Sequence, residues 1–465
     1  MMKVLLIMPD AHMHTLRIGR FVRSMREMPL SVCTLAAMIS DIPELDIKLI
    51  DGSVEDIPLD YPADLVGISV LTGCAVSAYE IADHYRERGV PVVLGGVHVT
   101  ILPGEAVNHA DAVLIGRGEQ TWPELVRDFM RGEMRKVYRE QPVEGDMLLN
   151  VPSPRYDLHR KHGYMLPYTI QATYGCRREC DFCTVPVVSR KYLKRPIADV
   201  VRDLRNTSGR YIAFNDVSLA DDPQYAKELF KAMIPLKKRW GGLTTVDIVR
   251  DHELLDLMVK SGCSYLLIGF ESTEETVLRQ IHKGFNQPVN YPDFMATMHS
   301  LGISIQGCFV FGFDNDDHDI FRQTVERVRE LKIDIPRYSI YTPYPGTRLF
   351  QRLRRENRII SYNWNDYDTM HVVIKPAKMT PDELYAGFKW AYKETFKLKH
   401  ILGRMRGIGL NCAINFCGNL AYRIFVRRLY HEPRFARPYS LECPGSAPAP
   451  EQYNANFRED RICRS

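Results

Sequence analysis

The sequence predicts an α/β protein with a doubly wound, Rossmann-like N-terminal domain, a central β/α barrel of complete or partial TIM type, and a helical C-terminal region. Short runs rich in Val, Ile and Leu alternate with helical segments, this order continues to about residue 375, and the pattern beyond is helical. The 465 residues also exceed the roughly 250–300 at which a single core stops growing. We predict a first domain at 1–138, a linker at 139–167, a barrel at 168–375, and a helical region with an irregular tail at 376–465.

The first domain contains apolar runs that we interpret as strands of a parallel sheet. The expected strands are Val4–Met8, Ile47–Ile50, Leu65–Val70, Val90–Leu94 and Ala112–Ile115, and the clearest helices are Ala75–Arg88 and Trp122–Arg131. Near-continuous apolar strands indicate burial on both faces, and therefore helices on both sides of the sheet. The ligand of such a sheet lies in a crevice at the carboxyl ends of the strands.

Glycines and hydroxyl residues gather at these expected strand ends. The candidate ligand contacts are Ser69, Thr72, Gly95, Gly96, Gly116 and Glu119. Glycine allows the backbone to approach a large ligand closely, whereas the alternative for each glycine pair alone is a tight turn between strand and helix. Three such turns along one sheet edge favour a ligand. The absence of G-x-G-x-x-G after the first strand argues against an ordinary dinucleotide.

A second series of strands and helices predicts the barrel. The expected strands are Tyr168–Tyr174, Ile212–Phe214, Thr244–Ile248, Tyr265–Phe270, Ser304–Phe313 and Arg337–Thr342. The expected helices are Ile197–Arg205, Gln224–Lys237, His252–Lys260, Ser272–His282, Pro292–Leu301 and Asp319–Leu331. In a β/α barrel the chemistry takes place at the loops that follow the strands.

Composition narrows the class of protein. A net charge of +4 is too small an excess over this length to predict nucleic-acid binding. No run reaches the ~20 apolar residues of a membrane span. The 11 cysteines are an odd number for a disulfide framework, and eight of them are scattered singly. We therefore expect a cytoplasmic protein.

The remaining cysteines, Cys176, Cys180 and Cys183, lie together in one short loop. Three thiolates can hold three corners of a [4Fe–4S] cubane, which normally takes four, so that one iron stays open to another ligand. The alternative is a structural zinc ion, which requires four protein ligands. The nearest histidines, His159 and His162, precede the expected first barrel strand without a zinc-finger spacing.

The spacing C-x-x-x-C-x-x-C, with Phe182 before the last cysteine and a barrel strand in front, resembles the radical S-adenosylmethionine (AdoMet) enzymes. The resemblance implies a [4Fe–4S] cluster held by the three cysteines, whose open iron binds AdoMet. It also implies an external one-electron reductant of the flavodoxin or ferredoxin type, whose electron splits AdoMet into methionine and a 5′-deoxyadenosyl radical.

Later segments are similar to landmarks of the same enzymes. The resemblance places Asp216 and Ser218 against the methionine amine, Asp247 against the ribose, and Gly269 and Glu271 in a Gly-x-Glu-Ser turn. For each carboxylate taken alone, the alternative is a helix N-cap, because each precedes a helical pattern.

A doubly wound domain in front of this barrel resembles the cobalamin-binding subclass of these enzymes. The resemblance implies that the strand-end candidates contact cobalamin, with the corrin between the domains. His12, in Asp10-Ala11-His12, is a candidate lower cobalt ligand or only a polar loop residue. A transfer-RNA methylthiotransferase would need three cysteines in its front domain, which has Cys33 and Cys74. A cobalamin sensor without catalysis would leave the cysteine loop unexplained.

The subclass implies C-methylation of an unactivated carbon in a hydrophobic small molecule, or alternatively radical ring formation or rearrangement without methyl transfer. Around Asn411, Asn415 and Asn419 the tail is either an amphipathic helix on a membrane surface, within 401–430, or a helix packed on the barrel. The segment beginning at Thr380 resembles lipid-modifying relatives, including the hopanoid methylases. This favours a lipid over a natural-product scaffold or a tetrapyrrole.

Overall fold

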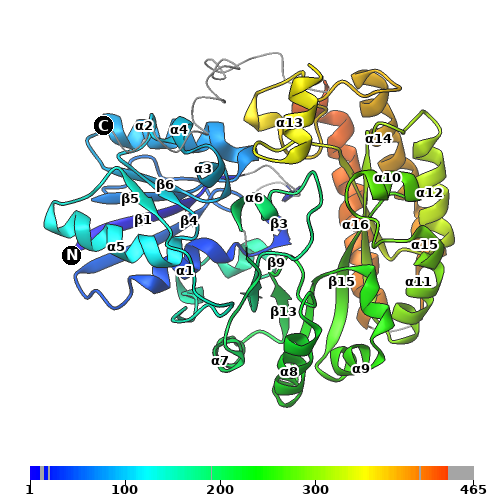
Figure 1. The fold of residues 1–465 in the computed structure, drawn as a ribbon, viewed down its shortest axis with the longest axis horizontal. Coiled ribbons are helices and arrows are strands. Elements are labelled where there is room, and N and C mark those ends of the chain that lie inside the picture. The colour runs from blue at the N-terminus through cyan, green and yellow to red at the C-terminus, as the bar shows by residue number, and fades with distance from the viewer. Residues whose placement is uncertain (11–14, 19–20, 190, 408–409, 438–465) are drawn as a thin grey trace.

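The computed structural model describes residues 1–10, 15–18, 21–189, 191–407 and 410–437. The chain forms an N-terminal α/β domain, blue and cyan in Figure 1, and a second α/β domain, green to orange, beside it. His12 and the tail beyond Arg437 lie outside the described residues. The mixed α/β class predicted from the sequence is confirmed.

The front domain has one parallel sheet in the order β4-β1-β5-β6-β7-β8. Its strands are β1 (Met2–Met8), β4 (Leu45–Asp51), β5 (Leu65–Ser69), β6 (Val92–Gly95), β7 (Ala112–Ile115) and β8 (Val137–Arg139). Its helices are α1 (Leu30–Met38), α2 (Ala75–Glu87), α3 (Val97–Ile101), α4 (Pro103–Ala106) and α5 (Gly118–Arg131). In Figure 1, α1 and α5 cover one face of this sheet and α2 and α4 the other. The strands are buried on both faces, as their composition predicts.

This strand order has one switch point. β1 pairs with β4 on one side and with β5 on the other, so the chain winds outward in both directions from between β1 and β5. Ligands of doubly wound sheets bind outside the carboxyl ends of the strands at this point. The ends of β1 and β5 therefore mark where a ligand belongs.

A hairpin that the sequence pattern did not predict follows β1. Strands β2 (Thr15–Ile18) and β3 (Phe21–Glu27) pair antiparallel, and β3 pairs in parallel with β9 (Tyr164–Leu166) from the expected linker. The hairpin thereby joins the front domain to the segment that leads into the second domain. It lies close to the carboxyl end of β1, beside the switch point.

The second domain contains a six-stranded parallel sheet in chain order, as in a partial barrel. Its strands are β10 (Thr169–Ile170), β13 (Tyr211–Phe214), β14 (Arg239–Thr244), β15 (Cys263–Glu271), β16 (Ser304–Phe311) and β17 (Ile335–Ile340). The helices around it are α7 (Ile197–Asn206), α8 (Pro223–Met233), α9 (His252–Lys260), α10 (Glu275–Gln280), α11 (Tyr291–Ser300), α12 (Ile320–Glu330) and α13 (Arg348–Arg355). Short strands β11 (Thr173–Tyr174) and β12 (Leu193–Lys194) pair antiparallel at its edge.

One expected strand is wrong. Residues 244–248 were expected to be a strand, but β14 ends at Thr244 and Val246–Arg250 is a 3-10 turn. The true strand is rich in glycine, which has low strand propensity. Glycine is suited to this place because a Cβ at Gly241 would lie 2.9 Å from the carbonyl oxygen of Tyr265. Two other expectations are too long, since 168–174 divides into β10 and β11 and the helix expected at 272–282 covers only Glu275–Gln280.

The C-terminal region is helical, with α14 (Pro381–Thr395), α15 (Leu398–Arg404) and α16 (Leu410–His431). The predicted N-cap Thr380 is confirmed, because its side chain accepts a hydrogen bond from the Glu383 N–H. Helix α16 packs on the barrel through its asparagine face. Asn415 donates to Ser304 at 2.9 Å and Asn419 to the Asp334 carbonyl oxygen at 2.9 Å.

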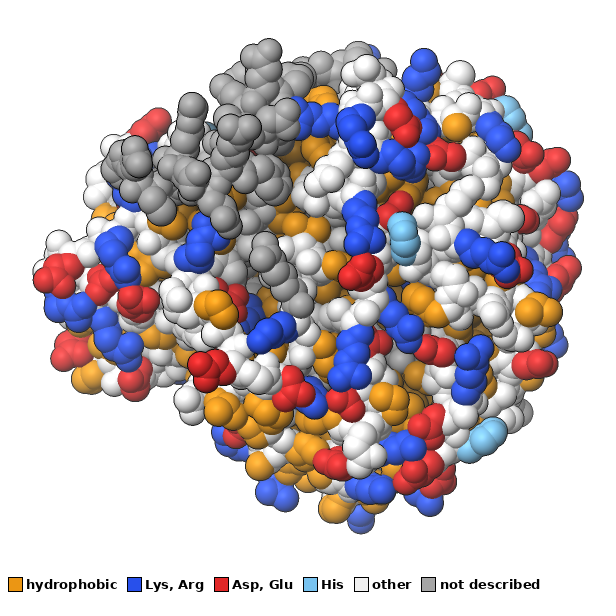
Figure 2. Space-filling view, viewed as in Figure 1, with side chains coloured by type: hydrophobic (Ala, Val, Ile, Leu, Met, Phe, Trp, Pro, Cys, Tyr) orange, Lys and Arg blue, Asp and Glu red, His pale blue; other side chains and the backbone are white. Residues whose placement is uncertain are grey.

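These contacts support the packed-helix alternative for 401–430. Within the described ranges, no helix is both long enough and apolar enough to cross a bilayer. Figure 2 shows Lys and Arg interspersed with Asp and Glu over this face of the molecule, in keeping with the small net charge of +4.

Candidate functional site

The three clustered cysteines lie on the loop between β11 and α6 (Val185–Val188). Gly175 opens this loop at φ +85°, where a side chain would collide with the Lys191 carbonyl. Cys183 donates its backbone N–H to the Cys180 carbonyl at 3.2 Å, which tightens the turn. All three thiols are half-buried. The loop thus presents three sulfur atoms at the carboxyl end of the first barrel strand.

The chemistry of these thiols suits a cluster of iron atoms. Burial, reinforced by Asp221, raises the pKa of Cys176 to about 12, and burial raises the pKa of Cys180 to about 11. Cluster binding must therefore displace protons from the thiols, as metal binding to cysteine generally does. No three His, Cys, Asp or Glu side chains among the described residues converge on a point that could hold a single metal ion. A cubane does not need such convergence, because each of its irons takes one thiolate.

Glu271 and Lys283 form a buried ion pair beside the cysteine loop. The Lys283 ammonium lies 2.6 Å from a Glu271 carboxylate oxygen. Burial lowers the pKa of Lys283, but Glu271, Cys180 and Cys183 outweigh it, so that the pKa lies above its usual range. Glu271 has a left-handed backbone, φ 63°, which only a few per cent of non-glycine residues adopt. A Cβ at Gly269 would collide with both side chains, so the glycine makes room for them.

Neither Asp216 nor Ser218 points toward open space. The Asp216 carboxylate is 1% exposed and accepts hydrogen bonds from the backbone of Ala172 and Thr173. Burial raises its pKa to about 6. Asp216 therefore holds the end of the first barrel strand in place. Ser218 is also buried and donates to Asp221 at 2.7 Å.

Asp221 is a site residue that the sequence analysis missed. One of its oxygens accepts hydrogen bonds from the Cys176 thiol at 3.2 Å and from the Arg177 N–H at 2.9 Å. Asp221 lies three residues beyond Ser218, and the next residue, Asp222, caps helix α8. Lys283 was missed too, since no spacing signal marks a lysine twelve residues after Glu271.

Asp247 lies in the 3-10 turn after β14 rather than at the end of the strand. It accepts a hydrogen bond from Arg178 of the cysteine loop at 2.5 Å. The Arg178 guanidinium also lies over the Phe285 ring, 4.3 Å from its centroid. These contacts connect the cysteine loop to the carboxyl ends of β14 and β15. Phe182, on the same loop, makes an edge contact with the Tyr341 ring.

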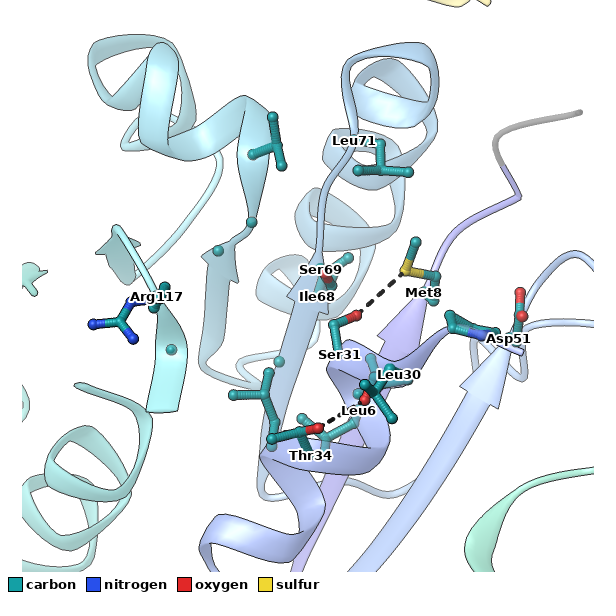
Figure 3. Close-up of a pocket in the computed structure, with 18 of the residues that line it drawn as sticks. Leu6, Met8, Leu30, Ser31, Thr34, Asp51, Ile68, Ser69, Leu71 and Arg117 are labelled. Atoms are coloured by element: carbon teal, nitrogen blue, oxygen red, sulfur yellow. Dashed lines mark hydrogen bonds between the residues drawn. The ribbon is translucent and has the colours of Figure 1, made fainter. Parts of the chain in front are cut away.

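A cavity of about 400 Å³ opens at the switch point of the front sheet, facing the second domain. Figure 3 shows Met8 at the end of β1, Ser69 on β5 and Ser31 on α1 around this space. Five predicted contacts line the cavity: Ser69, Gly95, Gly96, Gly116 and Glu119. The facing wall comes from the second domain and the hairpin: Gln171, Tyr174, Val188, Asn215, Ser24 and Glu27. The cavity thus lies between the front strand ends and the cysteine-loop side of the barrel.

The cavity wall contains tight glycine turns and two buried donors. Gly96 and Gly116 have φ of +103° and +94°, and a Cβ at Gly96 would lie 2.8 Å from Val70 backbone atoms. The indole N–H of Trp122, which is 1% exposed, finds no hydrogen-bond partner in the described residues. The same holds for one terminal nitrogen of Arg117. Both nitrogens are enclosed by protein atoms, so a ligand that supplies acceptors, as the amide and phosphate groups of cobalamin do, would reach them only after the wall around them adjusts.

Of the six strand-end candidates, all of which lie in the described part of the chain, Thr72 alone does not line this cavity. Its hydroxyl lies 3.3 Å from Nδ1 of His98, which is fully buried. Nε2 of His98 lies 3.3 Å from Glu105, and Glu105 accepts from the Trp364 indole at 3.0 Å. These four residues join the front domain to the segment after α13. We therefore assign Thr72 to the interface between the domains.

We expect Trp122→Phe to weaken cobalamin binding by about five- to tenfold, because one hydrogen bond is worth roughly 0.5–1.5 kcal/mol. The cofactor-free protein should keep its thermal midpoint or gain slightly, because the substitution removes an unpaired buried donor. Titration of the protein with cobalamin, followed by absorbance, measures the affinity. Trp390→Phe is the control, since Trp390 is 40% exposed. Equal weakening by both substitutions, or by neither, would contradict this role for Trp122.

Family models match both parts of the chain. The Radical SAM superfamily model matches residues 170–323, which include the cysteine loop. The B12 binding domain model matches residues 21–126, which include most of the cavity wall. These matches exclude the structural zinc reading. They also favour the cobalamin subclass over the transfer-RNA methylthiotransferase and over a sensor without catalysis.

Similar proteins agree with both matches. The chain is 32% identical to bacteriochlorophyllide d C-12(1)-methyltransferase of Chlorobaculum tepidum over 87% of this chain and 90% of that protein. It is 28% identical to the C-8(2)-methyltransferase of the same organism, over 78% and 84%. The fold resembles OxsB, a cobalamin-dependent AdoMet radical enzyme solved with aqua-cobalamin and AdoMet, with a TM-score of 0.65 at 15% identity over 92% and 72%.

The cysteine loop, the cavity between the domains and the near full-length relative lead to one assignment. The protein is an enzyme of the radical AdoMet superfamily with a cobalamin domain, and its cofactors are a [4Fe–4S] cluster, AdoMet and cobalamin. The chain belongs to the cobalamin-dependent radical S-adenosylmethionine methyltransferases.

Proposed function

We propose that the protein methylates an unactivated carbon of a large hydrophobic ring compound of the tetrapyrrole kind. The observation that carries this proposal is the cavity that the front-sheet glycines share with Gln171, Tyr174 and Asn215 of the second domain. Cobalamin bound in this cavity would lie next to the cysteine loop, so that methyl donor and radical source would face one substrate. The tetrapyrrole preference rests on the two bacteriochlorophyllide methyltransferases to which the chain is similar. It replaces the preference for a lipid drawn from the C-terminal segment.

The bound groups would supply reductive cleavage of AdoMet at the cluster and methyl transfer from cobalt. In the net reaction two AdoMet molecules and two electrons convert a C–H bond into C–CH₃. The products are S-adenosylhomocysteine, methionine and 5′-deoxyadenosine, and the last carries the hydrogen taken from the substrate. A one-electron donor of the flavodoxin or ferredoxin type would supply the electrons.

The residues of the chain would bind and orient these groups. Cys176, Cys180 and Cys183 would hold the cluster. The Lys283 ammonium and the Glu271 carboxylate, buried beside the cysteine loop, would meet the carboxylate and the polar groups of AdoMet. Asp221 holds the Cys176 end of the loop through the Arg177 N–H. These fixed contacts keep the reacting groups in place, which matters because a primary radical attacks whatever lies nearest.

The front domain would hold cobalamin in the cavity at the switch point. Gly95, Gly96 and Gly116 line this cavity, and the positive φ of Gly96 and Gly116 allows the tight turns that form its wall. Trp122 and Arg117 carry enclosed donors beside it that lack a partner among the described residues. Arg117 is itself held by Glu140 and lies over the Tyr174 ring, 5.4 Å from the centroid. Tyr174 directly precedes Gly175 of the cysteine loop. The contact between Arg117 and Tyr174 therefore connects the wall of the cavity to the cysteine loop.

Anaerobic reconstitution with iron, sulfide and cobalamin tests this proposal. The reconstituted enzyme, supplied with AdoMet carrying a CD₃ group, a reductant and a bacteriochlorophyllide, should give a product heavier by one CD₃-for-H replacement together with 5′-deoxyadenosine. Formation of 5′-deoxyadenosine and a cyclised product without CD₃ would overturn methyl transfer in favour of ring formation. Labelling of a lipid but of no tetrapyrrole would overturn the substrate class.

A further inference from the structure

The barrel sheet has one face packed on helices and one that faces inward. On β17 the Tyr338 hydroxyl lies 2.7 Å from the Thr395 hydroxyl of α14, so Tyr338 points outward. On β16 the Phe311 ring lies 4.9 Å from that of Phe321 on α12, so Phe311 points outward too. Because side chains alternate along a strand, Arg337 on β17 and Cys308 on β16 point to the inner face.

Arg337 brings a full positive charge to this inner face. The side chain is half-buried, and it forms no hydrogen bond or ion pair with the part of the chain that the structure describes. Burial disfavours its charge, but Tyr422, Cys308, Tyr392 and Glu27 raise its pKa above its usual range, so the guanidinium stays protonated. A partly desolvated guanidinium offers five donors in a fixed planar array and is costly to leave without an acceptor.

The side chains next to Arg337 on the inner face of the sheet carry no charge. Leu267 on β15 and Val310 on β16 share its face and are partly exposed there. The neighbouring Tyr265 donates to Gln306, and Gln306 donates to the Tyr422 hydroxyl at 3.0 Å. Glu27 acts on Arg337 only at long range, since no ion pair joins the two. The inner face around Arg337 is therefore uncharged apart from this one cation, which has no partner among the residues that the structure describes.

Arg337 lies at the same level of the barrel as the AdoMet candidates. It pairs in register with Cys308, and Cys308 pairs with Gly269, whose neighbours are Glu271 and Lys283. Two strand spacings separate Arg337 from Gly269, about 10 Å at roughly 4.8 Å each. Glu27 lines the cobalamin cavity and also acts on Arg337, so the two regions adjoin.

We propose that Arg337 binds an oxyanion carried by the substrate, and that the substrate is accordingly an apolar molecule with an acidic group. A carboxylate or a phosphate monoester would both match the guanidinium in a two-point contact. With its acidic group held on β17, the substrate would present to the AdoMet candidates near Gly269 a carbon at a fixed distance from that acidic group. Arg337 is thus a residue that determines substrate class and position. This inference rests on the proposed function, whose radical chemistry it does not alter.

Binding of acid and ester pairs tests the proposal without catalysis. The probes are pheophorbide a, a chlorin with a free propionic acid, and its methyl ester, together with hexadecanoic acid and its methyl ester. With the anaerobic holoenzyme, fluorescence titration and competition should show the free acid of a pair binding at least about tenfold more tightly than its ester. Arg337→Gln should weaken acid binding by roughly ten- to a hundredfold and leave ester binding unchanged, so that the preference disappears.

Matched variants keep the outcome decisive. Arg337→Lys should retain part of the preference, and Glu27→Gln should strengthen acid binding about two- to fivefold because it removes an opposing charge. Arg423→Gln is the control, since Arg423 is half-buried and bonds only to the Phe396 carbonyl on the outside of the barrel. Displacement of the bound acid by hexadecyl phosphate would show that a phosphate serves as well as a carboxylate.

The proposal is overturned if wild type and Arg337→Gln show the same preference for the acid. It is also overturned if the wild-type protein binds acid and ester equally well in both pairs, or binds none of the four probes. A failure of this proposal can be distinguished from a failure of the proposed function. The proposed function would be contradicted if the wild-type enzyme formed no 5′-deoxyadenosine or transferred no CD₃ group. The preference for the acid is measured by binding alone.

Discussion

Replacing Cys176, Cys180 and Cys183 together by alanine will reduce 5′-deoxyadenosine formation to the background of a protein-free control. The expected loss is at least about a thousandfold, or about 4 kcal/mol in the barrier, because without bound iron no group in the protein can deliver an electron to the sulfonium. The variant should also lose the iron, the inorganic sulfide and the electron-resonance signal of the reconstituted enzyme. Liquid chromatography of 5′-deoxyadenosine and iron–sulfide analysis measure both losses.

Cys417→Ala is the control for this triple variant, because Cys417 is an exposed thiol on α16. It should keep the full iron content and the full rate. Cobalamin binding by the triple variant should also persist, since the cavity wall comes mainly from the front domain. The mechanism would be wrong if the triple variant still cleaved AdoMet, or if the anaerobic wild-type protein held one zinc ion and no sulfide.

Gly95→Leu will abolish retention of cobalamin, with a loss of affinity of about a hundredfold or more. Gly95 ends β6 and lines the cavity, and a Cβ there makes ordinary contact with Leu114 at 3.4 Å, with no strained backbone. A leucine side chain extends beyond that point and occupies space that the ligand needs. A hundredfold loss corresponds to about 2.7 kcal/mol. Gel filtration with added hydroxocobalamin, followed by absorbance of the protein peak, measures retention.

Gly95→Ala is the matched control, because its single methyl group fits at van der Waals distance. It should bind cobalamin within about threefold of wild type, whereas the leucine variant should still assemble the iron–sulfur cluster and form 5′-deoxyadenosine. Normal cobalamin retention by Gly95→Leu would place the cofactor elsewhere. Loss of the cluster as well would show that the substitution unfolds the protein rather than fills the cavity.

Much of the candidate site could be predicted from local sequence. The three cysteines are so close in sequence that they share one loop in any fold. The glycines follow apolar strands, and the carboxyl ends of parallel strands lie at the same edge of a sheet. Five of the six front-domain candidates accordingly line one cavity. Thr72 is different, because its side chain turns away to His98 in a contact 26 residues distant in sequence, which no local pattern encodes.

Other parts of the site depend on contacts between distant segments. Asp221 and Lys283 lie in unremarkable stretches and become site residues only because β13 and β15 bring them against the cysteine loop. Strand β14 escaped prediction because its glycines lack strand propensity, although close packing of Gly241 on β15 requires them. The sequence of helix α16 allowed either a helix on a membrane surface or a helix packed on the barrel. Its hydrogen bonds to Ser304 and Asp334 show that the asparagine face packs on the barrel.

The sequence by itself determined the order of α/β units, the three-thiol loop and the glycine-rich strand ends, since each depends on residues near one another in the chain. Only the tertiary structure decided that the glycine-rich strand ends line one cavity beside the three-thiol loop, and that Asp216 is a structural support rather than an open ligand. It also decided that Arg337 projects inward without a partner among the described residues. The reason is physical: burial, pairing of charges and the direction of a side chain depend on neighbours that folding brings from far along the chain.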